Sequence, residues 1–89
     1  MENYCFLCGR YGNTDRHHLI GGTGNRQLSE KYEKYLVVNL CRRCHIWAHE
    51  DPNVYKALHI YGEKTWIEKQ NSTVEEFIRV FGKNYLWEE

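Results

Sequence analysis

The sequence predicts a small α+β protein, and three observations lead to this class. The chain has 89 residues, which suits one domain over residues 1–89 and leaves no room for two. The β-branched run at 36–40 indicates a strand, whereas apolar residues at helical spacing in 74–81 indicate an amphipathic helix. Four cysteines in two C-x-x-C pairs offer the cross-link that a chain with such a small core usually needs.

The two cysteine pairs are the strongest motif. Cys5-x-x-Cys8 and Cys41-x-x-Cys44 each place two thiolates on one tight turn, and together they form the donor set of a closed tetrahedral zinc site. A redox pair and unlinked core cysteines are the alternatives, but a thioredoxin-type pair needs a βαβ context and no second pair. We therefore predict structural Zn²⁺, whose binding free energy adds to folding.

Composition excludes several other classes of protein. Hydrophobic residues make up 42% of the chain, too many for an unfolded polypeptide. The sequence has no run of about 18 apolar residues, and its first residues lack the pattern of a signal peptide. We expect a cytoplasmic protein with no membrane partner, in which disulfides are disfavoured.

Charge is distributed unevenly, although the formal net charge is zero. Residues 1–49 carry seven basic and four acidic residues, whereas residues 50–89 carry five basic and eight acidic residues. If the chain binds a polyanion, we expect the first half to make the contact. The candidate phosphate contacts are Arg16, Arg26, Lys31, Arg42 and Arg43.

The elements are expected in a simple order along the chain. They are a zinc knuckle at 4–14, a strand at 14–20, a glycine-rich loop at 21–25, a helical turn or loop at 29–35, a strand at 36–40 and a helix around 45–49. Asp51 and Pro52 then predict a helix start, and we expect the helical packing to be interrupted near Gly62.

The last helix has signals at both ends. Ser72 and Glu75 form a capping box, and Gly82 is the stop. The apolar stripe between them consists of Val74, Phe77, Ile78 and Phe81. Trp66 is expected to pack with this stripe over the first half, and His59 is expected to be a packing or surface residue rather than a ligand.

Four histidines carry the chemistry. His17 and His18 end the predicted first strand, and His45 and His49 lie one turn apart on the predicted helix. Three imidazoles from a strand and a helix hold one divalent metal, and a fourth deprotonates a water that attacks phosphorus. The alternatives are surface histidines and a zinc site in which His45, next to Cys44, replaces a thiolate.

The combined pattern resembles the HNH endonucleases, whose fold is a ββα-metal (His-Me finger) core stapled by a zinc knuckle. The matching residues are the first C-x-x-C pair, Asp15-Arg16-His17-His18-Leu19-Ile20, Asn39-Leu40-Cys41-Arg42-Arg43-Cys44-His45, and His49. They cover roughly residues 4–50. Residues 22–32 are similar to small HNH proteins of phages and prophages. The resemblance implies a zinc-stapled core at 4–50 and a C-terminal helical extension at 51–89.

The resemblance also implies roles for individual residues. It makes His18 the general base, Asn39 an orienting residue, and His17, His45 and His49 the ligands of a catalytic divalent metal. This metal is Mg²⁺, Mn²⁺, Ni²⁺ or Zn²⁺, since an all-histidine set tolerates the softer ions. We expect Arg26 to neutralise the scissile phosphate.

The expected function is metal-dependent hydrolysis of DNA phosphodiester bonds, with nicking and low sequence specificity. DNA is the expected partner, the resemblance allows a phage protein as a second one, and the oligomeric state stays open. The alternative is a catalytically inactive zinc-dependent DNA-binding or adaptor module, which the neutral net charge favours. A general base such as His18 has no use in that alternative.

Overall fold

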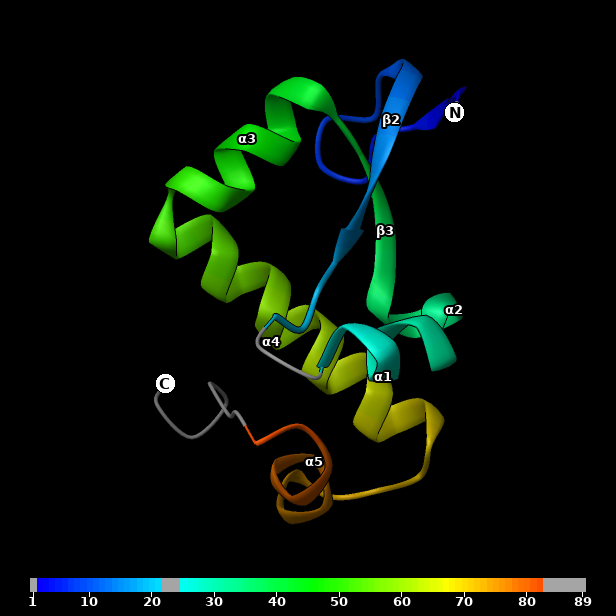
Figure 1. Cartoon of the computed structure of the whole chain (residues 1–89), viewed down its shortest axis with the longest axis vertical. Coiled ribbons are helices and arrows are strands. Elements are labelled where there is room, and N and C mark those ends of the chain that lie inside the picture. Colours follow the sequence, from blue (N-terminus) through cyan, green and yellow to red (C-terminus); the bar gives the residue numbers. More distant parts are fainter. Residues whose placement is uncertain (1, 22–24, 83–89) are drawn as a thin grey trace.

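A computed structural model describes residues 2–21 and 25–82, and it has the predicted α+β class. The elements are β1 (Glu2–Tyr4), β2 (Tyr11–His18), α1 (Asn25–Lys31), α2 (Glu33–Leu36), β3 (Val37–Cys41), α3 (Arg42–Glu50), α4 (Pro52–Lys69) and α5 (Val74–Phe81). The strands form one antiparallel sheet in the order β1-β2-β3. In Figure 1 the sheet and α3 lie at one end, α5 lies at the other, and α4 runs between them.

The central strand β2 differs from the predicted strand at both ends. It begins at Tyr11, because pairing of Tyr4 with Tyr11 extends the sheet onto β1, a strand of three residues that is too short to show a pattern. It ends at His18, and the next residue, Leu19, donates its N–H to the carbonyl of Leu36 at 2.9 Å. This places the two adjacent histidines at the very end of the strand.

Two short helices replace the predicted helical turn at 29–35. Asn25 is the first residue of α1 and is buried. Its side-chain amide donates to the carbonyls of Gly21, at 2.9 Å, and Phe81, at 3.0 Å. The second bond spans 56 residues of sequence, so local patterns could not reveal it. Most of the predicted glycine-rich loop, residues 22–24, lies outside the described residues.

Helix α4 is continuous, so the predicted interruption near Gly62 is wrong. Its start is as expected, because the Asp51 side chain accepts from the N–H of Asn53 at 2.9 Å. A Cβ placed on Gly62 would lie only 2.8 Å from the Cβ of Leu19. The glycine therefore permits close approach between α4 and the chain segment after β2.

We predict that Gly62→Ala destabilises the protein by about 1–3 kcal/mol, because the added methyl group overpacks the contact with Leu19. An alanine in an unobstructed helix would instead stabilise the protein by about 0.8–1.0 kcal/mol. Urea unfolding measures the sign of the change. The matched control is Lys64→Ala at an exposed position of the same helix. Stabilisation by Gly62→Ala would contradict the contact.

The N-cap of helix α5 lies one residue after the predicted cap, Ser72. Thr73 Oγ1, and not Ser72, accepts from a backbone N–H, that of Glu76 at 3.1 Å. Both Ser72 and Thr73 have a glutamate three residues later, so the sequence pattern alone cannot distinguish them. The predicted stop is confirmed, since Gly82 has a left-handed φ of 78°.

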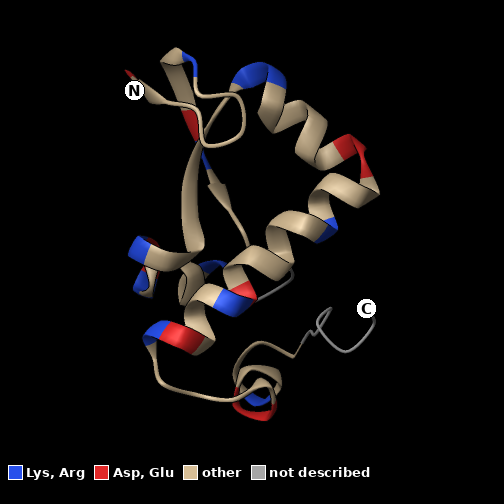
Figure 2. Cartoon of the chain, turned by 180° about the vertical axis from the view of Figure 1, so that it is seen from behind, with Lys and Arg blue, Asp and Glu red and all other residues tan. Residues whose placement is uncertain are grey.

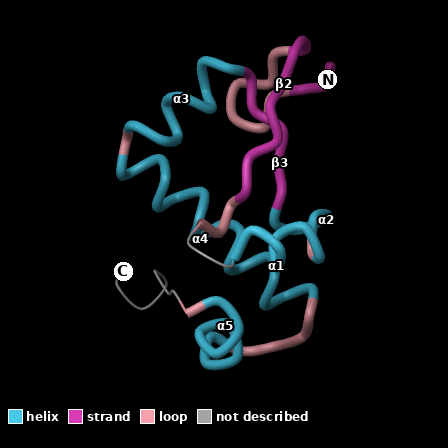
Figure 3. The backbone as a smooth tube through the Cα atoms, viewed as in Figure 1, coloured by secondary structure: helices cyan, strands magenta, loops and turns pink. Residues whose placement is uncertain are grey.

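The core consists of two clusters that meet at consecutive residues after β2. Leu19 belongs to a cluster with Cys5, Leu40, Cys44, Ala48 and Leu58. Ile20 belongs to a second cluster with Leu36, Trp66, Phe77 and Phe81, which confirms the predicted packing of the aromatic residues. Figure 3 shows α5 beyond the end of the sheet, while α4, which contributes Leu58 to the first cluster and Trp66 to the second, runs toward it.

Two further sequence predictions concern the helices. His59 is fully buried, with Nδ1 3.4 Å from Glu63 Oε1, so it is a packing residue and not a surface one. Among the described residues, no helix combines the length and the apolar composition that a membrane span requires.

Candidate metal centres

The four cysteines gather at one point of the structure. Their sulfur atoms all lie within 4.8 Å of one another. Cys5 and Cys8 lie in the turn after β1, Cys41 ends β3, and Cys44 lies in the first turn of α3. The turn is joined to the sheet by a hydrogen bond of 2.8 Å from the Phe6 N–H to a carbonyl of β3. This group could hold a structural metal such as zinc.

The thiols of this group differ in acidity. Burial by itself would raise the pKa of Cys5, but backbone N–H groups of Cys8, Cys41 and Leu7 lower it to about 6. Burial and hydrogen bonds with the other three thiols raise the pKa of Cys44 to about 12. Four thiolates so close together would repel one another, and a bound cation would supply the opposing charge.

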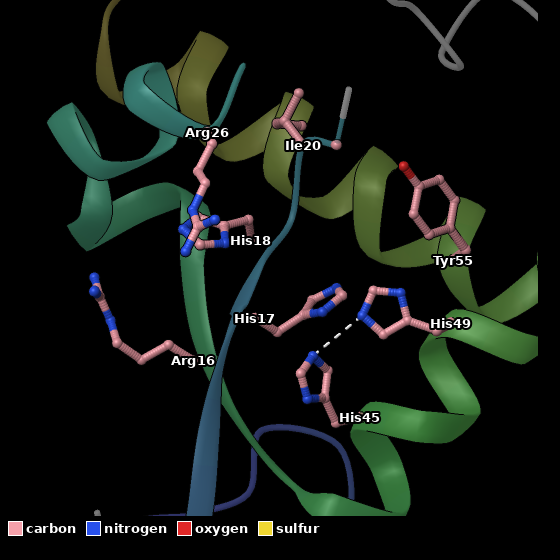
Figure 4. Close-up of a pocket in the computed structure, with 9 residues that line it drawn as sticks. Arg16, His17, His18, Ile20, Arg26, His45, His49 and Tyr55 are labelled. Atoms are coloured by element: carbon pink, nitrogen blue, oxygen red, sulfur yellow. Dashed lines mark hydrogen bonds between the residues drawn. The ribbon is translucent and has the colours of Figure 1, made fainter. Parts of the chain in front are cut away.

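Three histidines form a second group. His17 in β2 and His45 and His49 in α3 each place one ring nitrogen within 4.8 Å of the others (Figure 4). The Nε2 atoms of His45 and His49 are 3.1 Å apart. Zinc–nitrogen bonds in a tetrahedral site place the nitrogens ~3.3 Å apart, so the observed spacing fits one shared ion. His45 therefore lies in the histidine group, and four cysteines complete the other group without it.

Burial keeps His17 in the form that binds metals. The side chain is only 3% exposed. Burial, together with the neighbouring His45, His49 and His18, lowers the pKa of His17 to about 4. The imidazole is consequently neutral near pH 7, which is the form that donates a lone pair to a metal.

The histidine group lies in an open pocket of about 480 Å³. Its lining residues are Arg16, His17, His18, Ile20, Gly21, Arg26, His45, His49 and Tyr55. Two predicted site residues, His18 and Arg26, thus share a pocket with the three histidines, as Figure 4 shows. Asn39 does not belong to this lining set of described residues. It lies opposite Arg16 on β3, and its carbonyl accepts the N–H of Phe6.

His18 is held by a carboxylate. Its Nε2 lies 2.6 Å from Glu30 Oε2, while Arg16 contacts the other oxygen of Glu30 at 2.9 Å and also Glu33 at 3.0 Å. The hydrogen bond with His18, together with Arg16, lowers the pKa of Glu30 below its usual value. A carboxylate only accepts, so His18 donates from Nε2, and in the neutral form of the ring the lone pair lies on Nδ1.

Some of the candidate DNA-contacting bases are neutralised within the chain. Arg16 pairs with two glutamates, and Arg42 Nε lies 3.3 Å from Asp15 Oδ2. Figure 2 shows basic and acidic segments interspersed along the chain rather than separated. Arg26, like Arg16, lines the pocket that contains the histidines.

Three residues near the site were missed by the sequence analysis. Asp15 could have been found, because it lies two residues before His17 in a strand and so shares its face. No sequence pattern indicated a role for Glu30, because its helix was predicted only as a turn or loop. Tyr55, in the first turn of α4, also lines the pocket.

The two donor groups suggest different uses. Four thiolates close a tetrahedral site, whereas three imidazoles leave a position for water or substrate.

Comparison of the chain with known protein families, with curated proteins and with solved structures finds no match.

Proposed function

We propose that the chain is a metal-dependent endonuclease of the HNH type that hydrolyses DNA phosphodiester bonds. The observation that carries this proposal is the convergence of His17, His45 and His49 in a pocket that His18 and Arg26 also line. The succession of β2, β3 and α3, an antiparallel pair followed by a helix, supports it as the order expected of a ββα-metal core.

The three imidazoles would hold the catalytic ion. Their mutual spacing and the imidazole donor set fit a divalent transition metal. Such an ion acts as a Lewis acid that polarises the phosphate and stabilises the developing charge. Arg26 would contact the same phosphate through its guanidinium group.

His18 would act as the general base. Its Nδ1 takes a proton from water as the water oxygen bonds to phosphorus, and the bond from phosphorus to the leaving oxygen breaks. The imidazolium that forms is stabilised by Glu30, whose carboxylate lies 2.6 Å from Nε2. Arg16 holds that carboxylate in place, so its role is in positioning.

We predict that Glu30→Gln lowers kcat by about 100-fold, near the lower end of a general base's usual contribution, and changes KM little. The reason is that a neutral amide holds the His18 ring less firmly through its oxygen alone and does not stabilise the charged form of the ring. Glu33→Gln is the matched control, because it removes the other carboxylate partner of Arg16 and leaves the His18–Glu30 contact intact. Single-turnover cleavage of a labelled duplex measures both variants. Equal losses in the two would count against the orienting role.

Cleavage of supercoiled plasmid tests the proposal. Protein with one zinc per chain is incubated with Mg²⁺, Mn²⁺, Ni²⁺ or additional Zn²⁺. We expect ion-dependent conversion to the nicked form, and none without added ion or with His49→Ala. Absence of nicking with every ion, in folded protein, would contradict the proposal.

The adaptor alternative rests on a specific observation. The chain is neutral overall, and Arg16 and Arg42 are already paired with acidic side chains. Such a module would bind a partner through a zinc-stabilised fold without hydrolysis. DNA binding that survives in every histidine variant, with no cleavage by the wild type, would favour it.

A further inference from the structure

Asp15 connects β2 to the histidine-bearing face of α3. It shares a strand face with His17, since side chains two residues apart point the same way. Its Oδ2 lies 3.1 Å from Nδ1 of His45 and 3.3 Å from Nε of Arg42, both of them residues of α3.

The two ring nitrogens of His45 have different neighbours. Nδ1 faces Asp15, whereas Nε2 lies 3.1 Å from Nε2 of His49. An ionised carboxylate only accepts hydrogen bonds, so the proton of a neutral His45 belongs on Nδ1. The lone pair then lies on Nε2, on the side of the ring where His49 and His17 converge.

We propose that Asp15 is a positioning residue of the histidine site, which fixes the tautomer and orientation of His45 so that Nε2 is the metal-binding atom. The inference rests on the proposed function only in assuming that this site takes up a divalent ion. Carboxylate partners of this kind make a metal-bound histidine more basic, and their loss usually costs about 10–100-fold in metal affinity.

A simpler account would make Asp15 only the partner of Arg42. That ion pair is exposed, since the Arg42 side chain is 79% accessible, and exposed pairs contribute little. The Asp15–His45 pair is less accessible, at 37% and 25%. The two accounts differ in what removal of Arg42 should do to metal binding.

The first test measures Ni²⁺ affinity by calorimetry, with protein that already contains one zinc per chain. We expect Asp15→Ala to bind Ni²⁺ about 10–100-fold more weakly than the wild type. Asp15→Asn should lose less, because its amide oxygen still accepts from Nδ1, and Arg42→Gln should match the wild type. Zinc content and far-UV circular dichroism establish that each variant is folded. The inference is overturned if Asp15→Ala binds Ni²⁺ as tightly as the wild type, or if Arg42→Gln loses as much.

The second test reads the tautomer directly and needs no second metal. Long-range ¹H–¹⁵N spectra of the zinc-containing protein should show His45 protonated at Nδ1, and Asp15→Ala should shift it toward the Nε2-protonated form. An Nε2-protonated His45 in the wild type would overturn the inference. If the wild type binds no Ni²⁺, the proposed function fails, while the spectra still decide the role of Asp15.

Discussion

Chelation of the metal expected at Cys5, Cys8, Cys41 and Cys44 should unfold the chain. The four ligands join the turn after β1, the end of β3 and the start of α3, so their release frees three elements at once. Structural zinc contributes ~10–16 kcal/mol in zinc-finger peptides, which is as large as the ~5–15 kcal/mol total stability of ordinary domains. We expect loss of the cooperative thermal transition on chelation and its return when zinc is restored.

The same treatment should abolish metal binding by the histidines. Cys44 and His45 are neighbours in α3, so a metal bound by the cysteines would anchor the helix that places His45 and His49. Cys44→Ser should reproduce the effect of the chelator, because it removes the buried ligand on that helix. A chelated protein that keeps its melting temperature and still binds Ni²⁺ would show that the cysteines are not structural ligands.

Replacement of His18 by alanine should give the largest loss of cleavage that leaves both the fold and metal binding by the histidines intact. We expect kcat to fall by about 10²–10⁴-fold, the usual contribution of a general base. Zinc content and Ni²⁺ affinity should stay unchanged, since His18 is not one of the three clustered imidazoles. Single-turnover cleavage with saturating metal measures the chemical step.

His17→Ala is the matched comparison for His18→Ala. The two residues are adjacent in β2 but belong to different interactions, the histidine cluster and the Glu30 contact. His17→Ala should therefore lose Ni²⁺ binding as well as cleavage. If His18→Ala cleaves at the wild-type rate, another group must activate the water and the assigned mechanism is wrong.

The parts of the site that could be predicted from sequence are those fixed by local geometry. Residues four apart on a helix share a face, which places His45 beside His49. The spacing of the two C-x-x-C pairs is typical of a shared metal site, which predicts that all four cysteines lie close together. The structure brings their sulfurs together.

The parts that could not be predicted depend on distant contacts. Glu30 reaches His18 because α1 is fixed by Asn25, whose amide bonds to a carbonyl 56 residues away. Gly62 suggested a break because glycine weakens an isolated helix, but tertiary packing against Leu19 overrides that preference. Spacing along the chain holds no information on either contact.

We propose that the chain has two separate metal centres, one of cysteines and one of histidines. Metal stoichiometry should be measured by native mass spectrometry for the wild type and for His17→Ala, each with zinc and then with added Ni²⁺. We expect one zinc in both proteins and one additional Ni²⁺ in the wild type alone. A wild type that takes up no second ion, or a His17→Ala variant that takes it up equally, would contradict this proposal.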